Sequence, residues 1–331
     1  MENNCQDDTL NRRHFLTRCC KAGLLATGAG LAGWWFHDAH GPQRPSAVRT
    51  AFTLPDFSIP TITPRMSIVR GADRKQTVQR ALKAIGGLEQ FVKPGDRVML
   101  KVNAAFASPP LLGATTHPDL VEEVVRLCYR AGAARVMVTD NPINDPVSCF
   151  QLTGIERAAR LGGADVILPK EQYFAPVTVA EGRLIRAWPV LYEPLTQIDR
   201  LIGMAPVKDH HRSGASMTLK NWYGLLGGRR NIFHQDIHTI VTELAMMVRP
   251  TLVILDGTVS MMTNGPTGGS LSDLKPTHTM IVSTDGVAAD AFGATLLEKD
   301  SQSLPYIAKA AEAGLGTADY RQLAPQVEPE S

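Results

Sequence analysis

The stretch of sequence that decides the fold runs from Arg97 to Thr139 and reads RVMLKVNAAFASPPLLGATTHPDLVEEVVRLCYRAGAARVMVT. It begins with an apolar run of strand length, Arg97 to Val102, and ends with a second one, Arg135 to Thr139. Between them, residues 118–131 repeat apolar side chains at helical spacing, and the shared face consists of Leu120, Val121, Val124 and Cys128. A strand, a helix and a second strand in this order predict two parallel strands of one sheet with the helix packed across them.

The ends of this helix are marked in the sequence. Thr116 and Asp119 are spaced as a capping box at its beginning, and Gly132 is a typical residue after its last turn. We therefore expect Thr116 to cap the helix and Cys128 to lie in the core.

The same alternation extends in both directions. The expected strands are 66–69, 165–168, 200–207, 251–255 and 279–283, and the expected helices are 75–91, 151–161, 233–248, 287–297 and 304–313. Such alternation predicts an α/β fold with a mainly parallel central sheet flanked by helices. Residues 176–191 differ, because they alternate around Glu181-Gly182 and predict an antiparallel hairpin, either an extension of the sheet or a small lid.

The remaining segments suggest the domain boundaries. Residues 42–65 are rich in proline and predict a stiff linker, so that a single α/β domain spans residues 66–314. Residues 315–331 are expected to form a C-terminal tail, disordered from Ala324 onward.

Residues 1–41 have the features of an export address. Arg12 and Arg13 stand in Asn11-Arg-Arg-His-Phe-Leu-Thr17, ahead of the apolar run Ala22 to Phe36. Paired arginines before such a run are typical of a twin-arginine signal peptide, whereas a membrane-spanning helix needs about 20 apolar residues. We therefore expect export by the twin-arginine (Tat) machinery, to the periplasm or to the outer side of the cytoplasmic membrane.

Cleavage of this segment and its retention as an anchor are both open. Ala39 is the nearest small residue after the apolar run, but His37 stands where a cleavage site would have a second small residue. If retained, the segment would be the only membrane contact that the sequence predicts, because no later apolar run approaches about 18 residues.

Composition and charge narrow the class of protein. Hydrophobic residues at 44% and charged residues at 20% are typical of a soluble globular chain, and a net charge of +2 gives no electrostatic reason to expect a nucleic acid. Beyond the N-terminal segment the sequence holds two cysteines, Cys128 and Cys149. They could form one disulfide, but they cannot supply the four thiolates of an iron–sulfur cluster.

The predicted fold also predicts where a site would lie. Ligands of open parallel sheets bind beyond the carboxyl ends of the strands. The residues at those ends are polar here, namely Lys101, Asn103, Asp140, Asn141, Lys208, Asp209, His210, His211, Asp256, Thr284 and Asp285. Thr116 and His117, at a helix beginning on the same rim, could help to hold an anion. A merely solvated rim would also be polar, so both interpretations stay open.

The segment Ser216 to Asn231 adds a second group of candidates. It places Lys220, Asn221, Arg229 and Arg230 among glycines, a combination suited to binding a carboxylate or a phosphate. It matches neither a Walker A loop nor the Gly-x-Gly-x-x-Gly fingerprint, and it therefore does not predict a nucleotide site.

A divalent metal ion is a further candidate ligand. His234 and His238 are one helical turn apart, and histidines at that spacing can bind a transition metal, although two polar residues on a helix shoulder would have the same pattern. Asp256 follows an apolar strand and Asp290 stands among alanines, so each carboxylate needs a partner such as a backbone cap, a lysine or a metal.

Several of these segments together resemble the domain of unknown function 362 family, a bacterial and archaeal α/β family. The matching pieces, in the family's order, are Val98-Met-Leu-Lys-Val-Asn103, Ala114-Thr-Thr-His-Pro118, residues 130–136, Leu219-Lys-Asn-Trp-Tyr-Gly224, residues 256–257 with 264–266, and Asp285-Gly-Val-Ala-Ala-Asp290. The resemblance implies the same fold over about residues 66–297. Some relatives carry fused ferredoxin-like clusters, which implies a redox setting, but this chain lacks the cysteines for one.

Two hypotheses follow. In the first, the chain is an exported metal-assisted or acid/base enzyme that acts on a small anionic substrate in a redox-related pathway. Its catalytic residues would be Lys101, His117, Lys220, Asp256 and Asp285, its ligand-binding residues Asn103, Thr116, Asn221, Asn264 and Arg229, and its metal ligands His234, His238 and Asp290. In the second, it is a non-enzymatic periplasmic accessory protein that binds a ligand, a metal or a cofactor. A scaffold without a site is a third alternative.

Overall fold

The computed structural model describes residues 12–35 and 52–329. The chain divides into two compact units, residues 1–49 and 50–331. In the first unit, the helix α1 spans Arg12–Trp35, and its side chains from Phe15 to Gly28 are exposed. No helix within the described ranges is both long and apolar enough to cross a membrane. The side chains of Arg12 and Arg13 lie outside the described part of the chain.

The second unit is built on a mixed sheet that contains nine of the described strands. Along the sheet the order is β11 (Gln326–Glu328), β1 (Met66–Arg70), β10 (Leu274–Ser283), β9 (Leu252–Met261), β7 (Arg200–His210), β2 (Arg97–Lys101), β3 (Arg135–Thr139) and β4 (Asp165–Ile167), with β8 (Gly214–Ser216) paired to β7. β4, β3, β2, β7 and β9 run parallel, whereas β10 is antiparallel to both β9 and β1. The predicted α/β fold with a mainly parallel sheet is thus confirmed.

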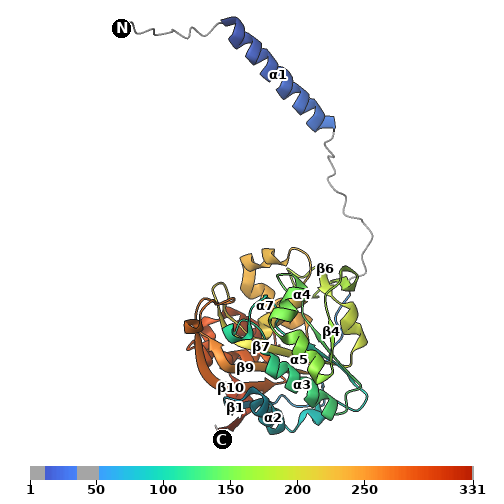
Figure 1. The fold of residues 1–331 in the computed structure, drawn as a ribbon, viewed down its shortest axis with the longest axis vertical. Helices are drawn as coiled ribbons and strands as arrows, with labels where there is room; N and C mark the ends of the chain where they lie inside the picture. Colours follow the sequence, from blue (N-terminus) through green and yellow to red (C-terminus); the bar gives the residue numbers. More distant parts are fainter. Residues whose placement is uncertain (1–11, 36–51, 330–331) are drawn as a thin grey trace, which may run out of the picture. The chain divides into compact units, whose positions relative to one another are not determined.

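Helices cover both faces of this sheet. They are α2 (Arg74–Ala84), α3 (Pro118–Arg130), α4 (Pro146–Leu152), α5 (Ile155–Gly162), α6 (Thr218–Asn221), α7 (Ile237–Met247), α8 (Gly286–Leu296) and α9 (Pro305–Glu312). Successive strand residues point to opposite faces, so Leu252 and Ile254 join the core beneath α2, α3 and α5, whereas Val253 and Leu255 join the core beneath α6 to α9. The labels of β1, β10, β9 and β7 follow one another across the sheet in Figure 1.

The chain reverses its direction of travel across the sheet between β2 and β7. From β2 it passes through α3, on one face, to β3, and from β7 it passes through α7, on the other face, to β9. β2 and β7 nevertheless pair directly, with Val98 opposite Arg200. This is a topological switch point, where the loops that leave two neighbouring strands diverge and open a crevice at their carboxyl ends.

Several predicted elements differ from the observed ones for identifiable reasons. The helix expected over 75–91 ends at Ala84, because Gly86 and Gly87 adopt positive φ angles of 103° and 88°. The helix expected over 151–161 is split into α4 and α5 by Gly154 in the left-handed region. Residues 230–236 form a 3-10 helix, η6, before α7 begins.

The segments on either side of the domain also differ from expectation. The tail was expected to be disordered, but β11 pairs in parallel with β1. Within the expected linker, Phe52 bridges Val177, Asp56 bridges Arg249, and Phe57 is buried. The hairpin is confirmed as a separate two-stranded antiparallel sheet of β5 (Phe174–Val177) and β6 (Trp188–Leu191).

Candidate anion-binding site

A cavity of about 260 Å³ lies at the switch point, at the carboxyl ends of β2, β3 and β7. We call it the inner cavity. It is lined by Asn103, Ala105, Phe106, Asp140, Asn141, Ile143, Lys208, His210, His211, Ser216, Lys220, Asn221, Tyr223, Gly224, Arg230, His234 and Pro266. The strand ends supply the first part of this set, and the segment from α6 through η5 (Trp222–Leu225) to η6 supplies most of the rest.

A buried ion pair between Lys101 and Asp140 borders the cavity. The two charged groups are 2.8 Å apart, and the lysine also donates to the backbone carbonyl and the side-chain oxygen of Asn221. Asp140 accepts from the backbone N–H groups of Ala104 and Asn141. Gly224 is required beside the pair, because a Cβ there would overlap the Asp140 carboxylate. Both carboxylate oxygens of Asp140 therefore already accept from protein groups.

Lys208, at the end of β7, is a second buried lysine. Its ammonium donates to the carbonyl of Ala114 at 2.5 Å and lies 5.3 Å from the centre of the Phe106 ring. Burial, aided by the positive charge of Lys220, lowers the pKa of Lys208 to about 7. No carboxylate forms an ion pair with it among the described residues.

Lys220, in α6, differs from both because its ammonium has no hydrogen-bond acceptor in the described part of the chain. The residue is 9% exposed, and its Nζ lies 5.1 Å from the centre of the Tyr223 ring, over the aromatic face. Burial and the nearby Arg230 guanidinium lower its pKa to about 8. Because Lys220 lines the inner cavity, a bound anion there would supply the acceptor that its ammonium lacks.

Three imidazole rings stack along one side of the cavity. The ring of His210 lies 5.0 Å from that of His211 and 5.9 Å from that of His234, with nearly parallel planes. The Nδ1 of His210 accepts from the backbone N–H groups of Arg212 and Ser213, so its hydrogen is on Nε2. Burial, followed by the charge of Lys220, lowers the pKa of His210 to about 2, and the ring is therefore a neutral N–H donor.

His234 has the opposite tautomer. Its Nδ1 lies 3.3 Å from the carbonyl of Asn231 and 3.1 Å from the hydroxyl of Tyr223. The Tyr223 hydroxyl donates to the carbonyl of Arg230 at 2.5 Å, and a carbonyl can only accept, so the hydrogen of neutral His234 is on Nδ1. Its Nε2 keeps a lone pair and can accept a proton. Burial lowers the pKa of His234, which favours this neutral form.

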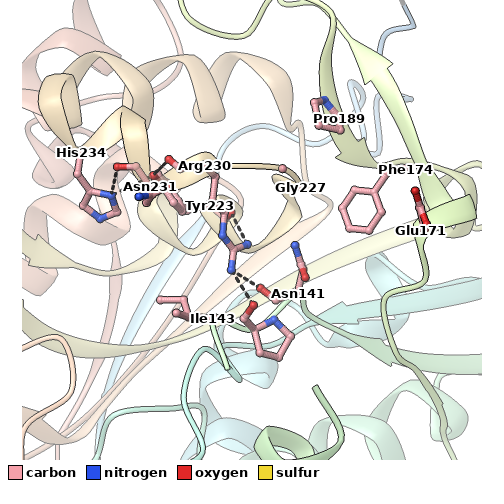
Figure 2. A pocket seen from close by; sticks show the side chains of 12 residues that line it. Asn141, Ile143, Glu171, Phe174, Pro189, Tyr223, Gly227, Arg230, Asn231 and His234 are labelled. Atoms are coloured by element: carbon pink, nitrogen blue, oxygen red, sulfur yellow. Dashed lines mark hydrogen bonds between the residues drawn. The ribbon is translucent and has the colours of Figure 1, made fainter. Parts of the chain in front are cut away.

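Arg230 lies at the boundary of a second cavity, of about 670 Å³, which we call the outer cavity. Its guanidinium donates to four backbone carbonyls, those of Asn141, Pro142, Tyr223 and Leu226. It thereby ties the loop after β3 to the segment 223–226. Figure 2 shows Arg230 between His234 on one side and Phe174 and Pro189 on the other.

The structure brings together part of the set of residues predicted from sequence. Asn103, Lys220, Asn221 and His234 line the inner cavity, and Lys101 lies beside it. The Nδ2 of Asn103 lies 3.4 Å from the Asn221 side-chain oxygen, whereas its own buried Oδ1 has no hydrogen-bond partner among the described residues. Lys101 is held by its ion pair, so it positions the cavity wall and is not a free ligand group.

Other predicted site residues lie elsewhere. His117, whose side chain accepts from the Asp119 N–H, is the N-cap of α3, so the predicted cap at Thr116 is wrong. Thr116 instead accepts from the N–H of Asn103 and donates to the carbonyl of Met204, which connects β2 to β7.

Three predicted acidic or amide residues have structural partners of their own. Asp256 pairs with Arg74 at 2.8 Å, and Asp285 accepts from backbone N–H groups at the start of α8. Asn264 donates to Asp273, and Pro266 from the same loop lines the cavity instead. Arg229 is exposed, and its neighbour Arg230 takes the place in the site that Arg229 was expected to have.

The three residues proposed as metal ligands are not brought together. His238 stacks on Tyr306, and Asp290 is fully buried and accepts from the N–H groups of Thr218 and Leu219. Within residues 12–35 and 52–329, no group of three or more His, Cys, Asp or Glu side chains could hold a metal ion.

The comparisons with known proteins give one family and a few distant relatives. A family model described as Domain of unknown function (DUF362) matches residues 98–295. The thylakoid-associated protein sll1697 of Synechocystis sp. is 24% identical over 247 residues, which cover 72% of this chain and 74% of that protein.

Two solved structures show a remote likeness. The lactate racemase apoprotein of Thermoanaerobacterium thermosaccharolyticum gives a TM-score of 0.38 at 12% identity, covering 74% of this chain and 58% of that one. A Thermotoga maritima protein gives a TM-score of 0.35 at 12% identity, covering 72% and 58%. This chain therefore spans less than two thirds of either structure.

Proposed function

This chain belongs to the DUF362 family of proteins, and we propose that it is an acid/base enzyme that binds a small anionic substrate in the inner cavity. The observation that carries the proposal is the ammonium of Lys220, which has no acceptor within the described ranges and lies in a cavity with an excess of cations. Lys101, Lys208, Lys220 and Arg230 lie in or beside the cavity, and Asp140, which is already paired with Lys101, is the one carboxylate in its described lining.

The groups around the cavity suit the binding of an anion followed by proton transfer. Lys220 can contribute a charge-assisted hydrogen bond, and the Nε2–H of His210 can contribute a neutral one. Lys208 and Lys220 have pKa values of about 7 and about 8, so each can give or take a proton near neutral pH. The Nε2 lone pair of His234 can accept a proton from a carbon or oxygen next to the bound anionic group.

Calorimetric titration of the full chain with acetate and with inorganic phosphate tests the binding step. We expect Lys220→Met to weaken binding about tenfold or more, because a charge-assisted hydrogen bond is lost. Lys170→Met is a matched control, because Lys170 also lies over a tyrosine ring, that of Tyr173 at 5.5 Å, but is exposed. Equal anion affinity of Lys220→Met and the wild type would overturn the proposal.

Deuterium exchange separates an enzyme from a binding protein. Acids that bind are incubated with the chain in D₂O, and NMR follows exchange at the carbon next to the carboxylate. We expect exchange in the wild type and its loss in Lys220→Met and in His234→Gln. Binding without exchange would favour the non-enzymatic alternative.

We also propose that the chain is exported by the twin-arginine machinery. The proposal rests on Arg12 and Arg13 ahead of the apolar run in α1. A double Lys substitution of these arginines should retain the chain in the cytoplasm, whereas Arg18→Lys, in the same helix, should not. Unchanged export of the double variant would contradict export by the twin-arginine machinery.

A further inference from the structure

We infer that the ligand carries its anionic group at one end only and has an apolar body, which occupies the outer cavity. This inference rests on the proposed function, since the inner cavity must hold the anionic group. The ligand class is then an amphipathic acid, with a carboxylate or a phosphate joined to an aliphatic or aromatic part.

The two cavities adjoin each other. Asn141, Ile143, Tyr223, Arg230 and His234 line both of them. The outer cavity, at about 670 Å³, alone falls within the roughly 300–1,000 Å³ of small-molecule sites. A bare acetate or phosphate at the inner end would leave this volume unused.

The lining of the outer cavity is suited to an apolar group. Its walls include Phe174 and Pro189 from the hairpin and Pro142 and Ile143 from the loop after β3. Gly227 and Gly228 add backbone without side chains. A Cβ on Gly227 would stand 2.6 Å from the ring of Phe174, so glycine is needed for this close approach.

Charge argues against a second anionic group in the outer cavity. Arg230 is the one cationic residue in the described lining, and four of its N–H groups are already given to carbonyls. Glu171, an exposed carboxylate on the opposite wall, would repel an anion there. A dicarboxylate or a bisphosphate is therefore disfavoured relative to a ligand with one charged end.

The hairpin wall is preformed. The N–H of Gly227 donates to the carbonyl of Pro189 at 2.8 Å, the indole N–H of Trp188 donates to the carbonyl of Gly227 at 3.1 Å, and Val190 bridges Leu226. Trp188 also packs against Phe233, with ring centres 4.4 Å apart. These contacts hold Phe174 and Pro189 in place, so little ordering is needed when an apolar group binds.

The test is a calorimetric titration of the full chain with straight-chain acids from acetate to octanoate, and with the eight-carbon diacid suberate. We expect affinity to rise about fourfold for each added methylene until the outer cavity is filled, as for any buried methylene. Suberate should bind at least tenfold more weakly than octanoate.

Two variants test whether the gain in affinity with chain length arises in the outer cavity. Phe174→Ala should reduce the gain with chain length and leave acetate binding unchanged. Ile143→Ser should also reduce the gain with chain length, and it is expected to fold because Ile143 is 64% exposed. Leu161→Ser is the matched control, since Leu161 is 58% exposed and lies near the end of α5, at the edge of the sheet where β4 begins.

The outcomes distinguish this inference from the proposed function. If acetate binds but affinity does not rise with chain length, or if suberate equals octanoate, the inference is overturned and the proposed function stands. If Phe174→Ala and Ile143→Ser keep the full gain, the apolar body lies elsewhere and the inference is again overturned. If neither acetate nor any longer acid binds, the proposed function fails and the inference fails with it.

Discussion

The ammonium of Lys101 lies 2.8 Å from the carboxylate of Asp140, and the two side chains are 1% and 2% exposed. The pair joins the ends of the neighbouring strands β2 and β3 next to the inner cavity. Burial lowers the pKa of Lys101, and the charge and hydrogen bond of Asp140 oppose that shift. The pair therefore supports the wall of the site, whereas the ammonium of Lys220 has no hydrogen-bond acceptor among the described residues.

Removing Lys101 should be strongly destabilising. Lys101→Met leaves the Asp140 carboxylate buried without its ion-pair partner, and breaking a buried pair in this way costs about 3 to 5 kcal/mol of unfolding free energy. The exposed Lys83→Met should change that free energy by less than about 0.5 kcal/mol. Urea denaturation measures both, and the double variant Lys101→Met with Asp140→Leu should be more stable than the single one. An unchanged urea midpoint for Lys101→Met would show that the pair contributes nothing.

The close approach of the backbone at Gly224 gives an independent test of the same wall. A methyl group there would overlap the Asp140 carboxylate and stand 2.7 Å from Lys101 Nζ, so Gly224→Ala must separate the pair. We expect loss of acetate binding and a fall of about 2 kcal/mol or more in unfolding free energy. Gly269→Ala, where a Cβ would meet no atom within 4 Å, should behave as the wild type. Full acetate binding by Gly224→Ala would contradict the geometry.

Anion binding should be coupled to proton uptake. Burial lowers the pKa values of Lys208 and Lys220 to about 7 and about 8, so between pH 7 and 9 a fraction of each is neutral. A bound anion favours the ammonium forms and raises both pKa values, so binding takes up protons there and weakens as pH rises above about 8. His210, with a pKa of about 2, contributes no proton.

Titration with acetate in two buffers of different ionisation enthalpy measures this uptake. We expect a positive proton uptake near pH 8 that vanishes below about pH 6, where both lysines are already protonated. In Lys220→Met, the acetate that still binds should take up fewer protons than in the wild type, because one of the two lysines is missing. Uptake of zero at every pH would mean that these lysines do not face the anion.

Asp290 should make the free energy of unfolding depend on pH in the same sense, falling as pH rises. Burial raises its pKa to about 7, against the effect of the Thr218 and Leu219 donors, so between about pH 4 and 7 the folded state holds a proton that the unfolded state has lost. The contribution of this group therefore falls as pH rises through that window. Asp285 and Tyr306 are the other titratable groups near it.

Comparison with Asp290→Asn isolates this contribution. The unfolding free energy of the wild type relative to the variant should fall by about 1 to 4 kcal/mol between pH 4 and 8, because each unit of pKa shift corresponds to about 1.4 kcal/mol. If the amide in Asp290→Asn itself changes the unfolding free energy, it does so equally at both pH values and does not affect this comparison. Parallel pH profiles would show that the carboxyl titrates normally.

Most of the fold could be predicted from the sequence, because its strands and helices follow strong local periodicity. The order of elements from β2 to β4 and the hairpin of β5 and β6 depend on apolar alternation and on glycines that the sequence displays directly. The lengths of β9 and β10 could not be predicted, because the second half of β9 and the first half of β10 lack an apolar run. These halves are strands because they pair with each other, for example Met261 with Leu274.

The site could be predicted only in part. The rule that ligands bind at the carboxyl ends of parallel strands placed Asn103, Lys208 and His210 on the candidate rim. It could not show that Lys101 is held in an ion pair while the ammonium of Lys220 has no acceptor in the part of the chain that the structure describes. That distinction depends on Asp140 and Asn221, the latter 120 residues away in sequence, and a partner at that distance leaves no local pattern.

The position of β7 between β2 and β9 also determines when the cavity can exist during synthesis. β2, β3 and β4 can pair as soon as residue 167 has emerged, and of the inner-cavity lining the residues from Asn103 to Ile143 would be present at that stage. Its lysines arrive with β7 and α6, and β7 becomes fully paired only after β9 has followed. An occupied cavity would therefore identify a chain in which β7, α6 and β9 have already been made. For a protein proposed to leave the cytoplasm already folded, ligand binding could then serve as a quality check before departure.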